Sequence, residues 1–377
     1  MTNVAYFSNG TSIYDLFFLI RLSERFNTIL LTFNPSPRYL PSGNKVLTIP
    51  QMVGALRVHD SPRFYGTILP QTVMLRKTLR EVRPDVLIGC GGLQYGFVAA
   101  LSNFRPLILF IWGSEVLIFP KFLPFRAFVK HSLKKADLVV VDSEVQRRAC
   151  IGLGCDEGKI VALPWVDIHD LVRRAEDVKV DKDKFREELG WNISDPVIVC
   201  TRMHWPIYNI DSIIRAIPLV LERIPNARFL FIGNGPLTKS YRRLVKDIGV
   251  ERNVHFAGFV PHDDIFYYLK NSDIYVSASL SDGTSASLIE AMACKLACVV
   301  SDIPGNREWI EDMENGLLFP AKNYHALAKR LIMLIEDRNL SATLANRAFE
   351  RACAKGDWKQ NSKVLFDSIE RLACSVH

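Results

Sequence analysis

The chain has 377 residues, of which 49% are hydrophobic and 23% are charged. This length suggests about two domains, and the apolar content excludes a disordered, collagen-like or low-complexity chain. No apolar run reaches the ~18 residues of a membrane-spanning helix, and no signal-peptide pattern follows Met1. Eight cysteines without a CxxC pair are typical of free thiols in a reducing compartment, so we expect a cytoplasmic protein.

The net charge of +7 is unevenly distributed along the chain. Residues 1–168 carry 19 Lys and Arg against 12 Asp and Glu, whereas residues 169–377 carry 28 of each. Within the first half, Phe119–Lys135 interleaves aromatic residues with cations and holds no acidic residue. Such a segment fits an anionic membrane surface, and it fits equally a solvated helix whose aromatic residues belong to the core. Nucleic acid is not an expected partner, because no nucleic-acid motif accompanies the basic charge.

Short apolar runs alternate with amphipathic stretches along the first half. The runs predict buried parallel strands at 4–7, 28–33, 85–89, 107–111 and 138–142. The stretches predict helices near 14–26, 71–82, 93–102 and 125–136.

The second half repeats this alternation. Strands are expected at 197–201, 228–232, 254–257, 274–277 and 298–301. Helices are expected near 210–223, 237–248, 263–270, 287–294, 307–312, 326–336 and 357–373. Two such blocks predict an α/β protein built of two doubly wound domains.

A charged stretch with little strand signal separates the two blocks. We therefore predict an N-terminal domain over residues 1–168, a linker over 169–195 and a C-terminal domain over 196–356. A last helix falls within 357–377.

Parallel sheets bind ligands at the carboxyl ends of their strands, so the residues that follow each strand are candidate site residues. The loop 8–12 leads into a helix and can present backbone N–H groups to phosphate, although it is neither GxGxxG nor a Walker loop. Arg202 follows one strand and can fork onto a diphosphate. Gly233 and Gly235 follow another and allow close approach to a ligand. A plain turn or a surface ion pair explains each of them equally well.

The segment 277–295 carries the densest set of candidate residues. Small residues from Gly283 to Ser287 lead into a helix, where their N–H groups form an anion site. Asp282 and Glu290 flank this run and can accept hydrogen bonds from vicinal sugar hydroxyls. The alternative is that Asp282 only caps the helix and that Glu290, in its first turn, only favours the helix dipole.

The pattern Asp282-x7-Glu290, followed by Ala291-Met292-Ala293, resembles the E-x7-E signature of the retaining family 4 (group 1) glycosyltransferases. Further segments similar to this family follow in the expected order at 232–236, 254–261, 299–308 and 315–319. The resemblance is specific over about 197–345 and thinner over the first half.

The resemblance implies a GT-B fold, in which two Rossmann-like domains face a central cleft and the C-terminal helix, 357–377, packs back on the first domain. It also implies retaining transfer of a sugar from a nucleotide-sugar donor, expected to be a UDP- or GDP-sugar, to a glycan or lipid-linked acceptor. No metal or other cofactor is expected. The N-terminal domain would bind the acceptor and the C-terminal domain the donor, with Phe119–Lys135 as a candidate contact with the inner face of the membrane.

Carried over by position, the resemblance assigns Glu290 to the nucleotide ribose, Asp282 to hydroxyls of the transferred sugar and Arg202 to the diphosphate. Glu115 is the candidate acceptor-side acid or base. The remaining expected donor contacts are Gly10, Thr11, Gly233, Gly235, Val260, Gly283, Thr284, Ser285 and Ala286.

The chain departs from the family pattern at two of these places. Asp282 replaces a glutamate and is one methylene shorter. The lysine expected about six residues after the arginine is absent, because Tyr208 and Asn209 stand there and His204 is the nearest other basic residue. Two alternative functions therefore stay open: another GT-B enzyme, such as a sugar-nucleotide epimerase or a phosphorylase, and a non-catalytic nucleotide-sugar-binding protein.

Overall fold

A computed structural model describes residues 1–37, 45–49 and 63–375. The chain divides into two compact units, the first formed by Met1–Trp165 with Gln360–His377 and the second by Val166–Lys359. Residues 169–195, which the sequence analysis assigns to a linker, belong to the second unit and carry helices α7 (Ile168–Glu176) and α8 (Lys182–Glu188).

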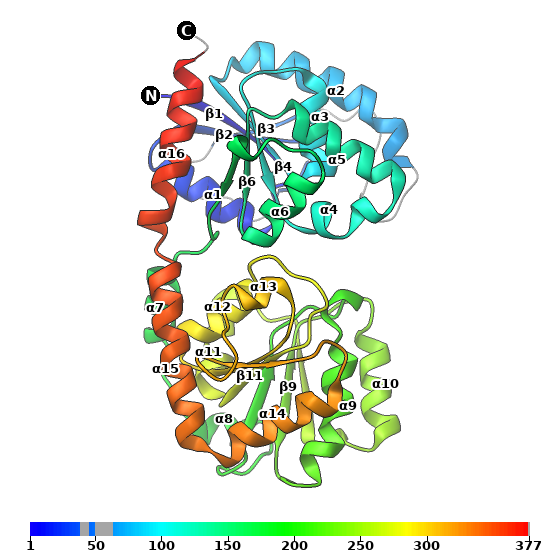
Figure 1. Ribbon diagram of the computed structural model, residues 1–377, viewed down its shortest axis with the longest axis vertical. Helices are drawn as coiled ribbons and strands as arrows, with labels where there is room; N and C mark the ends of the chain where they lie inside the picture. Colours follow the sequence, from blue (N-terminus) through cyan, green and yellow to red (C-terminus); the bar gives the residue numbers. More distant parts are fainter. Residues whose placement is uncertain (38–44, 50–62, 376–377) are drawn as a thin grey trace. The chain divides into compact units, whose positions relative to one another are not determined.

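The first unit contains a parallel sheet of seven strands in the order β3-β2-β1-β4-β5-β6-β7. Helices cover both of its faces, with α1 and α16 on one side and α2, α3 and α5 on the other (Figure 1). The strands are β1 Asn3–Phe7, β2 Asn27–Thr32, β3 Lys45–Thr48, β4 Val86–Cys90, β5 Leu107–Ile111, β6 Leu138–Val141 and β7 Ile160–Ala162. The helices are α1 Ile13–Ser23, α2 Arg63–Val82, α3 Gly96–Ser102, α4 Ser114–Leu117, α5 Leu123–Lys135, α6 Glu144–Gly152 and α16 Trp358–Cys374.

The C-terminal helix α16 packs within the first unit. Phe366 meets the ring of Phe26 with centroids 5.7 Å apart. Arg25 donates two hydrogen bonds of 2.8 Å to the carboxylate of Glu370. An aromatic contact and a two-pronged ion pair together fix the register of α16 on this unit.

The second unit contains a parallel sheet of six strands in the order β10-β9-β8-β11-β12-β13. The strands are β8 Val197–Cys200, β9 Arg228–Ile232, β10 Val254–Gly258, β11 Ile274–Ser277, β12 Ala297–Ser301 and β13 Leu317–Phe319. The remaining helices are α9 Ile210–Leu221, α10 Thr238–Ile248, α11 Ile265–Asn271, α12 Ala286–Ala293, α13 Pro304–Arg307, α14 Tyr324–Glu336 and α15 Arg338–Lys355. Together with the first sheet, this confirms the predicted pair of doubly wound, Rossmann-like domains.

Alternation along the central strands explains why both faces of the second sheet are buried. In β8, Ile198 and Cys200 enter one hydrophobic core, whereas Val197 and Val199 enter the core on the opposite face. Successive side chains of a strand point to opposite faces, so a run that is apolar at every position needs a cover on both. Helices α9, α10 and α14 supply one cover, and α7, α11 and α12 supply the other.

Strand order places one switch point in each sheet. In the first sheet the chain runs outward from β1 on one side and returns to β4 on the other. In the second it runs outward from β8 and returns to β11. Doubly wound sheets bind ligands at the carboxyl ends of the strands at such a point. The loops after β1, β8 and β11 are therefore the places where site residues are expected.

Within the described residues, no helix combines the length and the apolar character that a membrane span requires. All eight cysteines are free thiols, of which Cys353 is half-buried, Cys374 is exposed and the other six are buried.

Candidate donor site at the carboxyl edge of the second sheet

Arg202, just beyond β8, joins the loop that follows β11. Its Nη2 donates to Asp282 Oδ2 at 2.6 Å, and its Nη1 donates to the hydroxyls of Ser285 and Ser287 at 2.8 and 2.9 Å. Tyr275 of β11 completes the cluster through a contact of 2.8 Å between its hydroxyl and that of Ser287. The structure therefore brings together Arg202, Asp282 and Ser285, which the sequence analysis selected from distant parts of the chain.

The guanidinium of Arg202 is enclosed. Its side chain is 8% exposed, its charged carbon lies 4.0 Å from the centre of the Tyr208 ring, and no atom of the described residues forms a hydrogen bond with its Nε. Burial, the largest single cause, lowers the pKa of Arg202, but the Asp282 carboxylate together with Tyr208, Tyr275 and Cys200 outweighs it, so the pKa is raised. Burial also raises the pKa of Asp282, which the guanidinium offsets only in part. Tyr208 thus occupies the place of the missing lysine and stabilises Arg202 by a cation–π contact.

The start of α12 does not fit the alternative that Asp282 only caps this helix. The N-cap residue is Ser285, whose side chain does not cap the helix, and Asp282 pairs with Arg202 instead. Glu290 is the fifth residue of α12, so the prediction that it lies in the first turn is wrong. The loop is mostly enclosed, because Gly283, Thr284 and Ser285 are buried while Asp282 and Ala286 are half-buried.

Helix α13 presses against this loop at Gly305. A Cβ atom added to Gly305 would lie 2.4 Å from the carbonyl oxygen of Asp282 and 2.5 Å from that of Gly283. No side chain fits at that distance, so the loop and α13 are in direct backbone contact.

Glu290 is held by a residue that the sequence analysis did not select. His262, in the 3-10 turn η7 (His262–Asp264) after β10, places its Nε2 2.8 Å from Glu290 Oε1. Burial lowers the pKa of His262, but the hydrogen bond and charge of Glu290 outweigh it, so the pKa is raised. The available signal was its position, directly after the segment 254–261 that carries the resemblance.

The glycines after β9 serve loop packing. A Cβ on Gly233, whose φ is +130°, would lie 2.7 Å from the carbonyl oxygen of Arg202. A Cβ on Gly235 would lie 2.6 Å from that of His204. Both glycines therefore let the loop after β9 lie against the loop after β8. Val260, after β10, is buried among the apolar side chains of this unit.

His204 is no substitute for the missing lysine. Its ring lies against Tyr241 and Phe256, and its Nδ1 is 2.8 Å from the hydroxyl of Thr238. Burial and the nearby Arg242 lower the pKa of His204 to about 4. The imidazole is therefore neutral near pH 7 and supplies no charge to a diphosphate.

In the first unit, the backbone N–H groups of the loop after β1 already have hydrogen-bond acceptors close by in the sequence. The N–H of Gly10 bonds to Ser8 Oγ at 3.0 Å, and those of Thr11 and Ser12 bond to Asp15 Oδ2 at 3.1 and 3.0 Å. Asp15 and Ser12 also form the capping box of α1. The N–H groups predicted to face a phosphate thus bind the carboxylate of Asp15 in the first turn of α1 and the hydroxyl of Ser8 in the loop.

Glu115, in α4, is also turned inward. It is 4% exposed and accepts hydrogen bonds from the backbone N–H groups of Trp112 at 2.6 Å and Gly92 at 3.4 Å. Burial raises the pKa of Glu115, and these backbone donors act against that rise. Its contacts in this structure hold the turn after β5 to the turn after β4.

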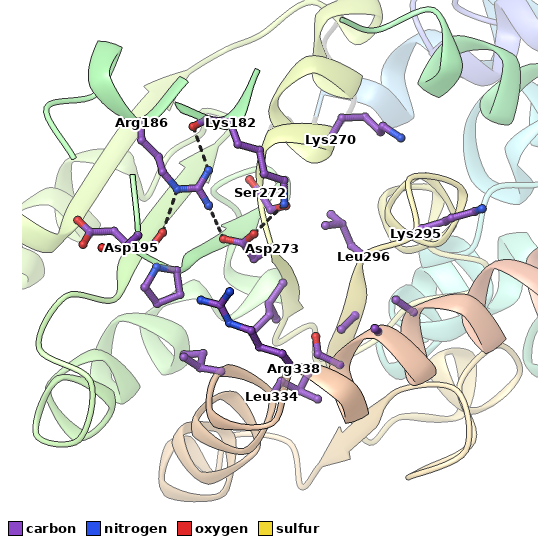
Figure 2. A pocket seen from close by; sticks show the side chains of 18 of the residues that line it. Lys182, Arg186, Asp195, Lys270, Ser272, Asp273, Lys295, Leu296, Leu334 and Arg338 are labelled. Atoms are coloured by element: carbon purple, nitrogen blue, oxygen red, sulfur yellow. Dashed lines mark hydrogen bonds and ion pairs between the residues drawn. The ribbon is translucent and has the colours of Figure 1, made fainter. Parts of the chain in front are cut away.

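A pocket of about 890 Å³ lies at the opposite edge of the second sheet, beside the first residues of β8, β11 and β12 (Figure 2). Two of the cations that line it, Lys182 and Arg186, pair with Asp273 at 2.8 and 2.6 Å. None of the predicted site residues lines this pocket. Among the described residues, no group of three or more His, Cys, Asp and Glu side chains could hold a metal ion.

Comparison with known families identifies the chain. The family model "Glycosyl transferases group 1" matches residues 181–351, and the model "Glycosyl transferase 4-like" matches residues 3–143. The chain belongs to the glycosyl transferases group 1. The family resemblance carried by Asp282-x7-Glu290 is thereby confirmed.

Relatives of this group 1 chain include mannosyltransferases. A GDP-mannose-dependent monoacylated alpha-(1-6)-phosphatidylinositol monomannoside mannosyltransferase of Corynebacterium glutamicum is 29% identical over 185 residues, 47% of either chain. A GDP-mannose-dependent alpha-(1-6)-phosphatidylinositol monomannoside mannosyltransferase of Mycobacterium tuberculosis is 24% identical over 342 residues, 85% of this chain and 88% of the relative. Several matches, that of Corynebacterium among them, span only about half of the relative's length.

Solved structures share the fold of this group 1 chain. HepE of Anabaena, solved in complex with UDP, superposes with a TM-score of 0.78 at 18% identity and covers 99% of this chain and 100% of its own. Together with the two parallel sheets, this confirms the predicted GT-B fold class.

Proposed function

We propose that the protein is a retaining glycosyltransferase, which moves a sugar from a nucleotide-sugar donor to a glycan or lipid-linked acceptor. The observation that carries this proposal is the position of two carboxylates, one in the loop before α12 and one in α12 itself. Asp282 meets Arg202 from the end of β8, and Glu290 meets His262 from the end of β10. Carboxylates and a guanidinium at the carboxyl ends of parallel strands suit a ligand that combines hydroxyls with a diphosphate.

The donor roles follow the family assignment. Glu290 binds the ribose, Asp282 binds hydroxyls of the transferred sugar, and Arg202 binds the diphosphate. Backbone N–H groups near Gly283–Ala286, at the positive end of α12, support the same anion. UDP- and GDP-sugars are the donors to test first, because HepE is solved with UDP-glucose and the Corynebacterium relative is GDP-mannose-dependent.

The ion pair between Arg202 and Asp282 suggests how the donor enters. Leaving a buried charge without a partner is strongly destabilising, so Arg202 has to exchange one anion for another. A diphosphate can take the place of Asp282 on the guanidinium, while Asp282 turns to accept hydrogen bonds from the sugar. Arg202 then offsets the charge that builds on the departing diphosphate without a metal ion.

The experiment is a thermal-unfolding screen of the purified chain against UDP-, GDP- and ADP-sugars. A ligand that binds the folded state raises the unfolding temperature, so the donor is the sugar nucleotide with the largest shift. NMR of the product with a glycan acceptor then reports the anomeric configuration, which transfer with retention leaves unchanged. No shift with any sugar nucleotide would reject the donor site, and an epimerised donor or dependence on inorganic phosphate would indicate another GT-B enzyme.

A second candidate is a nucleotide-sugar-binding protein without transferase activity. It is favoured by the engagement of Arg202 with Asp282, Ser285 and Ser287, and by Tyr208 where the family has a lysine. This candidate predicts a raised unfolding temperature with the donor but no glycosylated product and no released nucleotide diphosphate.

The first unit is proposed to bind the acceptor, on the cytoplasmic face of a membrane. Phe119, Phe125 and Phe128 pack against the core, so this part of the alternative interpretation holds. Phe122 and Leu123, however, are 58% and 81% exposed at the start of α5. Exposed apolar residues beside Lys121 and Arg126, which are also exposed, suit an anionic lipid surface.

Flotation with phosphatidylglycerol-containing vesicles tests this contact. We expect binding at low salt, and we expect Leu123→Glu to weaken it severalfold. The control is Val364→Glu, which introduces the same charge at an exposed position of α16. Absence of binding at low salt would remove the membrane from the proposal without affecting the donor site.

A further inference from the structure

A directed series of hydrogen bonds ends on the carboxylate of Glu290. Arg174 of α7 donates from Nε to Asp170 at 2.8 Å and from Nη1 to Asp263 at 2.7 Å. The same Nη1 lies 3.3 Å from His262 Nδ1, and His262 Nε2 lies 2.8 Å from Glu290 Oε1. Three segments, α7, η7 and α12, thus meet at one histidine ring.

The chemistry of the partners fixes the direction of these bonds. Arginine carries donors only, so in the neutral ring His262 Nδ1 accepts from Arg174 and Nε2 carries the proton. Nε2 therefore donates to the Glu290 carboxylate, which accepts only. The ring edge also contacts Phe266, which limits its rotation. The imidazole is held on both nitrogens and by one neighbouring ring.

Because the hydrogen bond between His262 and Glu290 is buried, it determines the orientation of the Glu290 carboxylate. The Glu290 side chain is 7% exposed and that of His262 is 28% exposed, so the contact is shielded from competing water. In the part of the chain that the structure describes, Oε2 of Glu290 has no hydrogen-bond partner. One oxygen is anchored by the histidine and the other remains available to a ligand.

We propose that His262 is a positioning residue for Glu290, and that the pair sets the preference of the donor site for nucleotides with intact ribose hydroxyls. This inference rests on the proposed function, because it takes the ribose as the ligand of Glu290. With Oε1 held by His262, the second oxygen is kept toward the vicinal hydroxyls. Without His262, the carboxylate turns toward water and the preference is lost, although the diphosphate contacts remain.

The experiment compares dissociation constants for UDP and 2′,3′-dideoxy-UDP by calorimetry, with the GDP pair used if the chain binds guanine nucleotides instead. For the wild type we expect UDP to bind at least about tenfold more tightly, because the dideoxy compound leaves the second oxygen of a buried carboxylate without a hydrogen bond. For His262→Leu we expect this ratio to fall below about threefold, with affinity for the dideoxy compound unchanged. His262→Gln keeps an N–H donor and should restore part of the ratio.

Two further variants separate positioning from general damage. In a Glu290→Ala background, His262→Leu should cause no further loss of the ratio, because both changes remove the same interaction. His325→Leu changes an exposed histidine of α14 and should leave both dissociation constants unaltered. If His262→Leu does not fold, Arg174→Met tests the same series from its other end.

The outcomes are distinct. If His262→Leu lowers the affinity for both nucleotides equally, the variant has lost structure. If it keeps the wild-type ratio of dissociation constants, His262 does not position Glu290. Either result overturns the positioning role and leaves the proposed function standing. A wild-type chain that binds neither nucleotide pair overturns the proposed function, and the positioning role with it.

Discussion

The loop after β1 and the loop after β11 each flank the switch point of their sheet, yet their polar groups are satisfied differently. In the first, Asp15 and Ser8 of the loop region itself accept from the N–H groups of residues 10–12. In the second, Arg202 from the loop after β8 donates to Asp282, Ser285 and Ser287. A loop whose N–H groups are bound by side chains of the same segment is a fixed part of the scaffold. A loop whose carboxylate and hydroxyls are bound by one cation offers a place where an incoming anion can compete.

Removal of Arg202 should have the largest effect on this comparison. Arg202→Ala leaves Asp282 without its cation in a buried site, a loss that costs about 3–5 kcal/mol of unfolding free energy. Denaturant unfolding followed by tryptophan fluorescence measures this, and nucleotide binding should vanish in the same variant. A matched control is Arg223→Ala, whose ion pair with Glu336 is exposed and should contribute at most about 1 kcal/mol.

Disruption of the first loop should damage stability alone. Asp15→Asn removes the charged acceptor shared by two backbone N–H groups and the hydroxyl of Tyr6, and we expect a loss of about 1–3 kcal/mol of unfolding free energy. Affinity for the nucleotide should stay at the wild-type value in calorimetry. A drop in nucleotide affinity together with stability would show that the loop of Gly10 and Thr11 contacts the phosphates. The two loops would then not differ in function.

Introduction of the missing lysine should sharpen the contrast. Tyr208→Lys exchanges a ring stacked on Arg202 for a second cation, so the unfolding free energy should fall by about 1 kcal/mol. Affinity for UDP or GDP should rise about tenfold, because an ammonium is added beside the diphosphate. Tyr208→Phe, which keeps the ring, is the control and should change neither quantity appreciably. If Tyr208→Lys leaves the nucleotide affinity unaltered, the diphosphate does not bind beside residue 208.

The remaining prediction concerns pH. The pKa of His204 is lowered to about 4, whereas an unfolded histidine titrates near 6.5. Between these values the unfolded chain binds more protons, so the unfolding free energy should decrease as pH falls from about 6.5 to 4. His204→Phe should flatten this part of the profile, measured by denaturant unfolding at several pH values. An unchanged slope would show that another group causes it.

The fold was largely predictable because its strands are apolar at nearly every position. Helices α6 and α7 escaped prediction although both are amphipathic, and α7 was assigned to the linker. Three other missed elements have little pattern. Strand β7 has three residues and β3 is an edge strand whose residues are mostly exposed, so neither shows a buried run. Helix α15 buries mainly small alanines between charged residues, which weakens its amphipathic signal.

The candidate site was predictable residue by residue but not in its pairing. Position after a strand selected Arg202, and the spacing of two acids selected Asp282 and Glu290. Their partners are set by contacts between residues 80 and 28 positions apart, which depend on the sheet order. The spacing Ser12-x-x-Asp15 is a capping-box pattern and is therefore a local signal for the role of Asp15. The signal for His262 is only its position after the segment 254–261.

The contact at Gly305 has a consequence for redesigning sugar specificity. The main chain of Asp282 and Gly283 rests on a glycine that leaves no room for even a methyl group. Substitutions in 282–285 that move this main chain, including changes made to alter the proposed sugar contacts, therefore shift α13 as well, so the two segments form one unit of mutagenesis. Libraries that vary both together should yield folded variants more often than libraries confined to the loop.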